Sequence, residues 1–354
     1  MPDSPRARAD LAAVPAYQAG RAAPRGAAKL SSNENPFPPL PGVEAAIADA
    51  AASVNRYPDF GSTRLLAALG SHLGVDQGHI AVGTGSVAVL AQVMNAMAGA
   101  GDEIVIPWRS FEAYPILATL AGASLVRVPL HGDGTHDLEA MAGAISDRTR
   151  LLMVCTPNNP TGPAVRRDQL DAFLDRVPRN VLVAVDAAYA EFVRDPAAPS
   201  AIDLALSRSN VVVLRTFSKA YGLAGVRVGY AVGPKAIISE LRKAQLPFGV
   251  TSMAEQAAIA SLGGKTELLR RVNVLVLERS RVQDTIRATG YEVPDAQGNF
   301  VWLPLGDRTD EFAEATARAG VVVRPFSGEG VRVTIGEPAA NDRWLAVLRD
   351  FLRL

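Results

Sequence analysis

A lysine directly after an apolar run is the residue of this chain that most suggests chemistry. Lys219 follows NVVVLRTFS and precedes AYGLAGVR. A lysine amine that is partly desolvated at the end of a buried strand has a lowered pKa and attacks aldehydes to form a Schiff base. Arg227, eight residues later, could be a fixed cation for a phosphate. A single lysine is more often a solvated surface residue, so this chemistry needs support from other residues.

Three other apolar runs also end in polar residues that could act on a ligand. HIAVG leads through Gly85 into Ser86 and a helical pattern, and the free N–H groups of a helix N-terminus bind phosphate. RLLMVC leads to Asn159, whose amide could donate to a ligand oxygen. NVLVAVD ends in Asp186, with Tyr189 three residues later. The ordinary alternatives are a helix N-cap, a plain turn and a surface carboxylate, respectively.

The elements that must position these residues alternate between helical patterns and short apolar runs. The runs are HIAVG, DEIVIP, SLVRVPL, RLLMVC, NVLVAVD, NVVVLRTF and VGYAVG. Near-continuous Val, Leu and Ile runs are typical of strands covered by helices on both faces, which predicts an α/β fold with a mostly parallel central sheet. Because ligands bind beyond the carboxyl ends of such strands, the polar residues should gather at one edge.

The length of 354 residues exceeds the usual size of a single core and favours two domains. We expect an N-terminal arm over residues 1–30 with one short helix, and a large domain over 31–249 that begins with a Pro-rich loop. A smaller α+β domain should cover 250–354, with a helical region over 251–288, a few strands and a C-terminal helix such as RWLAVLRDFLRL.

Composition excludes several classes of function. Lys and Arg number 36, as do Asp and Glu, so no overall positive field attracts nucleic acid or an anionic membrane. The single cysteine, Cys155, cannot form an internal disulfide and fits a cytoplasmic location. The four histidines lack metalloprotease spacing, so we expect no metal site.

Residues 80–101 carry no charge, but their glycines, Gln92 and Asn95 favour a strand, a turn and a helix over a membrane span. The N-terminus shows no secretory signal pattern.

Several motifs together resemble one enzyme family. TFSKAYGLAGVRVGY, PNNPTG, DAAYAEF, NENP and RYPD are similar to motifs of the fold-type I pyridoxal-phosphate aminotransferases, and in particular to the histidinol-phosphate aminotransferase branch. The resemblance extends from Tyr17 to Arg332. It implies pyridoxal 5′-phosphate as the cofactor.

The resemblance also implies a role for each polar residue near the cofactor. Lys219 would hold the cofactor as a Schiff base and move the proton of the substrate α-carbon, while Asp186 would pair with the pyridinium nitrogen. Asn159 and Tyr189 would hydrogen-bond the phenolic oxygen, and Phe111 would stack on the ring. The residues that would hold the phosphate are Gly85, Ser86, Thr216, Ser218 and Arg227.

The substrate and the second subunit are assigned in the same way. Arg332 matches the arginine of the family that binds the substrate carboxylate, and its planar fork suits a bidentate contact. Asn33, Tyr17 and Arg324 would line the substrate site, although Arg324 could also be an ordinary exposed strand residue. Tyr57 would reach the phosphate of the neighbouring subunit, which makes the expected active unit a homodimer.

Two departures from the branch bear on the substrate. Apolar Val87 and Ala88 follow Ser86 where the branch usually has acids, and PWRSFEAYP resembles the sister group of aromatic (phenylalanine) aminotransferases. An apolar pocket with Trp108 and Phe111 would favour a benzyl or phenol side chain.

The leading hypothesis is therefore an aromatic amino-acid:2-oxoglutarate aminotransferase that works by ping-pong half-reactions. Histidinol-phosphate aminotransferase is the closest alternative, and threonine-phosphate decarboxylase is a further one. The presence of Lys219 disfavours a non-catalytic regulator of the same fold.

Overall fold

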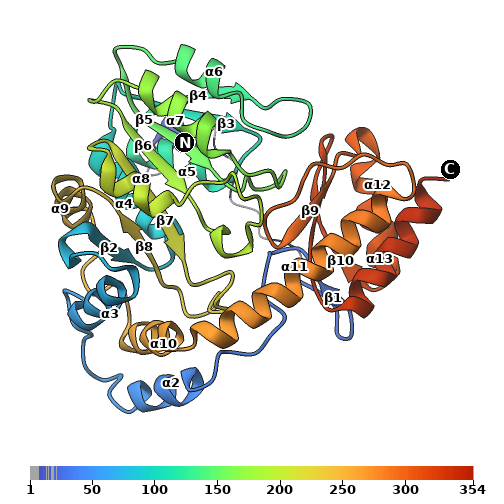
Figure 1. The fold of residues 1–354 in the computed structure, drawn as a ribbon, viewed down its shortest axis with the longest axis horizontal. Helices are drawn as coiled ribbons and strands as arrows, with labels where there is room; N and C mark the ends of the chain where they lie inside the picture. Colours follow the sequence, from blue (N-terminus) through green and yellow to red (C-terminus); the bar gives the residue numbers. More distant parts are fainter. Residues whose placement is uncertain (1–7, 13, 15, 17–19, 21, 354) are drawn as a thin grey trace, which may run out of the picture.

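The computed structural model describes residues 8–353 except 13, 15, 17–19 and 21. In this part of the chain, a seven-stranded sheet has the order β2-β8-β7-β6-β5-β3-β4 (Figure 1). All its strands are parallel except β8, which is antiparallel to β2 and β7. The predicted α/β fold with a mostly parallel sheet is confirmed. The strands are β2 (Ile80–Gly83), β3 (Glu103–Trp108), β4 (Ser124–Pro129), β5 (Thr149–Cys155), β6 (Leu182–Asp186), β7 (Val211–Thr216) and β8 (Gly229–Val232).

Helices cover both faces of this sheet. Leu151 and Met153 of β5 belong to one buried cluster, whereas Leu152 and Val154 belong to another. The first cluster includes residues of α4 (Ser86–Met97), α5 (Ala113–Ala121) and α9 (Lys235–Lys243). The second includes residues of α6 (Leu138–Gly143), α7 (Arg167–Arg176) and α8 (Ala201–Ser207). Burial of both faces explains why the strands read as continuous apolar runs.

The predicted helical region over 251–288 is two helices, α10 (Ser252–Gly263) and α11 (Lys265–Arg287), which meet at Gly264. Helix α10 contacts α2 (Val43–Ala51) and α3 (Thr63–Leu73). Helix α11 then runs towards the C-terminal part of the molecule (Figure 1). The predicted domain boundary at residue 249 stays a prediction. Helix α10 follows that position in the sequence, but it packs against α2 and α3, which belong to the predicted large domain.

The C-terminal part is built around a three-stranded antiparallel sheet of order β11-β12-β9. Strand β10 pairs instead with β1, in parallel, so the end of the N-terminal arm lies against the C-terminal part. The short helix α1 (Ala9–Ala12) lies in the arm. The remaining elements are β1 (Ala28–Lys29), β9 (Phe300–Leu303), β10 (Val321–Val322), β11 (Arg324–Phe326), β12 (Gly330–Thr334), α12 (Thr309–Arg318), α13 (Pro338–Phe351), η1 (Gln77–His79), η2 (Ala190–Phe192) and η3 (Gly306–Arg308).

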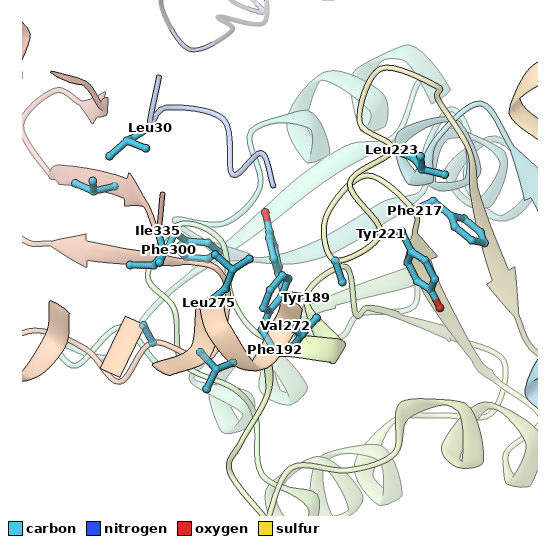
Figure 2. Close-up of a cluster of buried hydrophobic side chains, with 14 of the residues drawn as sticks. Leu30, Tyr189, Phe192, Phe217, Tyr221, Leu223, Val272, Leu275, Phe300 and Ile335 are labelled. Carbon is cyan, nitrogen blue, oxygen red and sulfur yellow. The ribbon is translucent and has the colours of Figure 1, made fainter. Parts of the chain in front are cut away.

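A continuous apolar cluster joins the two parts. Figure 2 shows Val272 and Leu275 of α11 beside Phe300 of the C-terminal sheet and Tyr189 of the large part. The rings of Tyr189 and Phe300 pack edge to face with centroids 5.0 Å apart. The cluster therefore fixes the C-terminal sheet against the region that follows β6.

The uncharged segment over residues 80–101 forms β2, a turn and α4, as the interrupted pattern predicts. Across the described residues, every helix is too short or too polar to cross a bilayer.

Candidate active site

A cavity of about 220 Å³ opens where the carboxyl ends of β5, β6 and β7 face the C-terminal sheet. Its wall contains polar, charged and aromatic side chains from both parts of the molecule. The lining residues are Gly20, Ser31, Ser32, Ser86, Val87, Ser110, Phe111, Glu112, Cys155, Asn159, Asp186, Ala188, Tyr189, Thr216, Ser218, Lys219, Arg227, Arg324, Phe326 and Arg332.

Of the predicted site residues that the structure describes, most lie on this wall and three do not. Gly85 directly precedes Ser86, and Asn33 contacts the lining residue Tyr189 through a hydrogen bond. Tyr57 lies elsewhere on the surface, 83% exposed. Tyr17 is outside the described residues.

Lys219 follows β7 and extends into the cavity. Its Nζ donates to the carbonyl oxygens of Ser32 (3.1 Å) and Asn33 (3.4 Å). Burial lowers the pKa of the Lys219 amine to about 7, and the positive charge of Arg332 adds to this effect. At neutral pH roughly half of such amines are uncharged, against about one in 2,500 for an ordinary lysine. A neutral amine is the form that can act as a nucleophile or a base.

Asp186, the last residue of β6, lies buried at the floor of the cavity. Its Oδ2 accepts a hydrogen bond from Tyr114 Oη at 2.9 Å, and its Oδ1 accepts from the Ala188 N–H at 3.3 Å. Burial raises the pKa of Asp186, while the bond from Tyr114 lowers it. A carboxylate in this position can pair with a cationic ligand atom, because such a partner offsets the cost of burying its charge.

The N-terminus of α4 forms a cradle with Thr216 at the end of β7 and with Ser218 and Arg227, which follow it. Gly85 precedes the helix with φ +81°, and a Cβ atom there would lie 2.3 Å from Arg227 Nη2. Arg227 Nη1 donates to Ser218 Oγ at 3.2 Å, and the Ser218 N–H donates to Thr216 Oγ1 at 3.1 Å. Helix N–H groups, hydroxyls and a guanidinium together suit a phosphate.

Arg332 and Asn159, which both line the cavity, are joined by a hydrogen bond. Arg332 Nη1 donates to Asn159 Oδ1 at 2.5 Å, and Arg332 Nη2 donates to the Ser31 carbonyl at 2.7 Å. Because the amide oxygen of Asn159 accepts from Arg332, its nitrogen is the end that can donate to a ligand. Nearby, Asn33 Nδ2 donates to Tyr189 Oη at 2.9 Å, and burial raises the pKa of Tyr189.

Sequence reasoning missed two residues that shape the site. Tyr114 binds Asp186, and Glu112 forms an ion pair with Arg324 at 2.7 Å. Both lie close to Phe111 at the start of α5. Tyr114 could have been found from the sequence, because a spacing of three residues puts it on the same side of a helical turn as the predicted cofactor residue Phe111.

The structure contradicts the predicted contribution of Trp108 to the pocket. Trp108 is not among the lining residues. Its ring packs near the buried cluster beneath α4 and α5, with Arg109 Cζ 4.5 Å and Arg127 Cζ 5.3 Å from its centroid. Phe326 of β11 lines the cavity instead, packed edge to face against Trp302 at 5.4 Å.

A cavity with a reactive lysine, a buried carboxylate and a phosphate cradle at the carboxyl edge of a parallel sheet defines a class of enzyme that holds a phosphorylated aldehyde. The family model for aminotransferase class I and II matches residues 26–348. The chain belongs to this family.

Individual relatives agree with this family. The chain is 56% identical to a protein of Streptomyces coelicolor named aromatic amino acid aminotransferase, over 98% of both chains. It is 54% identical to a Rhodococcus jostii protein of the same name, over 97% of this chain and 95% of the other. Histidinol-phosphate aminotransferase from Sinorhizobium meliloti in complex with pyridoxal-5′-phosphate superposes with a TM-score of 0.84, at 29% identity over 92% and 91% of the two chains.

The cofactor of the enzyme is pyridoxal 5′-phosphate, and the cavity suits each of its functional groups. The cradle at Gly85 matches the phosphate, since only a residue without a Cβ atom lets Arg227 approach α4 this closely. Asp186 matches the ring nitrogen and Lys219 the aldehyde. The donor set therefore fits the group.

Proposed function

We propose that this aminotransferase takes the amino group of phenylalanine or tyrosine and delivers it to a 2-oxo acid, with 2-oxoglutarate as acceptor. The observation that carries the proposal is the aromatic lining: Phe111 and Phe326 face the same cavity as Lys219 and Arg332. The names of the relatives at 56% and 54% identity support the same choice of donor.

Pyridoxal phosphate supplies an aldehyde that exchanges amines and a ring that withdraws electrons from the substrate α-carbon. Lys219 Nζ is the group we assign to bind the aldehyde and to take the proton from that carbon. Its pKa of about 7 supports this role, because a general base works best when its pKa is near the working pH.

The other residues of the cavity hold the cofactor in one orientation. Asp186 would keep the ring nitrogen protonated through a charge-assisted hydrogen bond. Asn159 and Tyr189 would donate to the phenolic oxygen, and Phe111 would stack on the ring. The phosphate would be held by Gly85, Ser86, Thr216, Ser218 and Arg227.

Arg332 is assigned to the substrate carboxylate. Its guanidinium is anchored by Asn159 and by the Ser31 carbonyl, so it needs little ordering when the substrate arrives. Arg324 and Asn33 complete this side of the site, and Tyr17 is proposed to join them from the arm.

Histidinol-phosphate aminotransferase is the second candidate. Arg324 and Arg332 are register partners on β11 and β12 and both line the cavity, as a phosphate-binding site would require. The likeness to the Sinorhizobium meliloti structure also supports this candidate.

Mixing the holoenzyme with one donor at a time, without an acceptor, separates the candidates. Phenylalanine should convert the bound cofactor to its aminated form, which is read as a loss of the absorbance of the Lys219-bound cofactor. Histidinol phosphate should change this absorbance far more slowly. A loss of absorbance with histidinol phosphate alone would overturn the proposal.

We further propose that the active unit is a homodimer. The aromatic patch formed by Tyr57, Phe60 and Phe248 supports this assembly. Tyr57 and Phe60 are 83% and 62% exposed, and Phe248 stacks on Tyr57 with centroids 4.7 Å apart. Exposed apolar patches of this kind mark interaction sites.

A cytoplasmic location is also proposed, supported by the single thiol of Cys155.

A further inference from the structure

Among the described residues, two ion pairs join the segment before α5 to the hairpin of β11 and β12. Arg109 Nε donates to Glu329 Oε2 at 2.9 Å, and Arg109 Nη2 donates to Glu329 Oε1. Glu112 Oε2 lies 2.7 Å from Arg324 Nη2. Arg109 and Glu112 follow β3 of the central sheet, whereas Arg324 and Glu329 belong to the hairpin. The two parts of the molecule are therefore tied together beside the cavity.

The side chain of Arg109 also packs on the ring of Phe326. Its Cζ lies 5.5 Å from the centroid of Phe326 and 4.5 Å from that of Trp108. A guanidinium over the face of a ring is attracted by the ring electrons. The backbone at this point is held as well, because the Arg109 carbonyl accepts from Asn158 Nδ2 at 3.1 Å. Arg109 is thus a fixed contact between the large part and Phe326.

Glu329 holds the end of the hairpin that carries Phe326. The Glu329 N–H donates to the Phe326 carbonyl at 2.9 Å, and the Glu329 carbonyl accepts from the Gly306 N–H at 3.1 Å. Glu329 therefore connects Arg109 to the backbone of a residue whose ring lines the cavity. Trp302 supports the same ring from within the C-terminal sheet, with centroids 5.4 Å apart.

We propose that Arg109 and Glu329 are positioning residues that set the place of Phe326 in the cavity and thereby favour an aromatic substrate side chain. This inference rests on the proposed function, in which Phe326 is part of the aromatic lining. Arg109 and Glu329 lie outside the lining, so their effect on substrate choice is indirect. Phe326 is the lining residue that both of them contact.

The shape of the substrate side chain gives the proposal a measurable consequence. A rigid ring gains from a wall at a fixed distance, because close packing is lost when the wall shifts. The unbranched side chain of methionine has more rotatable bonds and adapts to a displaced wall. Loss of the pair should therefore weaken phenylalanine more than methionine.

Helix α11 offers a matched control. Glu267 Oε1 accepts from Arg271 Nε at 2.7 Å, and Arg271 Cζ lies 5.5 Å from the centroid of Phe37. The side chains of Arg271 and Glu267 are 11% and 30% exposed, against 22% and 38% for Arg109 and Glu329. Glu267, Arg271 and Phe37 lie outside the cavity lining. Glu267→Gln therefore changes a comparable ion pair that packs on a ring elsewhere in the molecule.

The test measures transamination by the holoenzymes, with phenylalanine or methionine as donor and 2-oxoglutarate as acceptor. In Glu329→Gln, the ratio of kcat/KM for phenylalanine to that for methionine should fall about tenfold. The loss should appear as a higher KM for phenylalanine, with kcat within about threefold of the wild type, since the pair does not touch the reacting atoms. Glu267→Gln should leave the ratio within about threefold of the wild type.

Binding of unreactive acids gives a readout that needs no turnover. 3-Phenylpropanoate carries the carboxylate and the benzyl group without the amine, and hexanoate replaces the ring with a flexible chain. Calorimetry should give a Kd for 3-phenylpropanoate that is about tenfold higher in Glu329→Gln and in Arg109→Gln than in the wild type. The Kd for hexanoate should stay within about threefold.

Phe326→Leu shows whether the pair acts through that ring. Glu329→Gln/Phe326→Leu should have the same ratio of kcat/KM values as Phe326→Leu alone, because the ring that the pair positions is absent from both. Additive losses in the double variant would overturn the positioning role. So would an unchanged ratio and an unchanged Kd for 3-phenylpropanoate in both Glu329→Gln and Arg109→Gln. A wild-type enzyme that reacts with histidinol phosphate and not with phenylalanine would instead overturn the proposed function.

Discussion

Lys219 is reactive only when its amine is neutral, so its pKa sets the pH at which the apoprotein takes up its cofactor. With a pKa of about 7, the protonated fraction falls as pH rises through neutrality. The rate constant for uptake of pyridoxal phosphate should therefore rise up to about pH 8 and then level off. Stopped-flow absorbance of the apoprotein mixed with the cofactor measures this rate.

Lys219→Ala is the control for that experiment. It should show no absorbance of lysine-bound cofactor at any pH, and it should not transaminate at the native rate. A rate for the wild type that keeps rising tenfold per pH unit through pH 9 would mean that the amine has an ordinary lysine pKa.

Tyr114 affects the ionisation of Asp186, although our proposal gives Tyr114 no direct contact with the cofactor. The hydrogen bond from its hydroxyl lowers the pKa of Asp186. In Tyr114→Phe this pKa should rise, so the acidic limb of the kcat/KM profile should move to higher pH. A hydrogen bond to a charged group contributes about 1.5–3 kcal/mol, so kcat/KM should fall roughly tenfold to a hundredfold.

Tyr291→Phe is a suitable comparison, since it removes another tyrosine hydroxyl bond, to the Pro304 carbonyl. Its pH profile should be that of the wild type. If Tyr114→Phe had the same acidic limb as the wild type, Tyr114 would have a packing role only.

At the scale of elements, the turn between β2 and α4 depends on a residue without a side chain. Alanine at Gly85 would place a Cβ atom 2.3 Å from Arg227 Nη2 and would adopt an unfavourable φ of +81°. Gly85→Ala should weaken cofactor binding at least about tenfold, because Arg227 must leave the phosphate cradle. Titration of the apoprotein with pyridoxal phosphate gives the Kd.

Gly122→Ala separates backbone strain from loss of the cradle. Gly122 has a similar φ of +84°, but a Cβ atom there would meet nothing closer than 3.6 Å. Both variants should lose about 1–2 kcal/mol of stability. Only Gly85→Ala should change the Kd, and equal Kd values for the two variants would contradict the assignment of the cradle.

The elements explain why parts of the site could be predicted from the sequence. The strands before Asp186 and Lys219 are continuous apolar runs, so the edge where these residues meet follows from local pattern. Arg332 and Arg324 could be assigned only through the family resemblance, because periodicity does not indicate which strands face the cavity. The pairing of Glu112 with Arg324 joins residues 212 positions apart, which no local signal indicates.

The predicted place of Trp108 in the pocket was wrong, and the reason lies in strand geometry. Neighbouring residues of a strand point to opposite faces, so a shift of one position decides whether a ring lines the cavity or the core. The sequence around Trp108 does not fix this register. The ring packs beside Arg109 and Arg127, away from the cavity.

At the scale of the whole molecule, the site needs both parts of the chain and, in our proposal, a second subunit. Asp186 and Lys219 come from the central sheet, and Arg324 and Arg332 come from the C-terminal sheet. Tyr57 does not reach the cavity of its own subunit. A contribution across a dimer interface would give this exposed tyrosine a function.

Mixing two impaired variants tests that arrangement directly. Lys219→Ala and Tyr57→Ala homodimers should each be impaired, the first completely. After subunit exchange, a mixed dimer should contain one site with both Lys219 and the partner-derived Tyr57 intact, so activity per Lys219-bearing subunit should rise above that of Tyr57→Ala alone. Sedimentation would verify the exchange. No recovery in verified mixed dimers would mean that Tyr57 does not act across the interface, because a residue acting within its own subunit cannot be replaced by its partner.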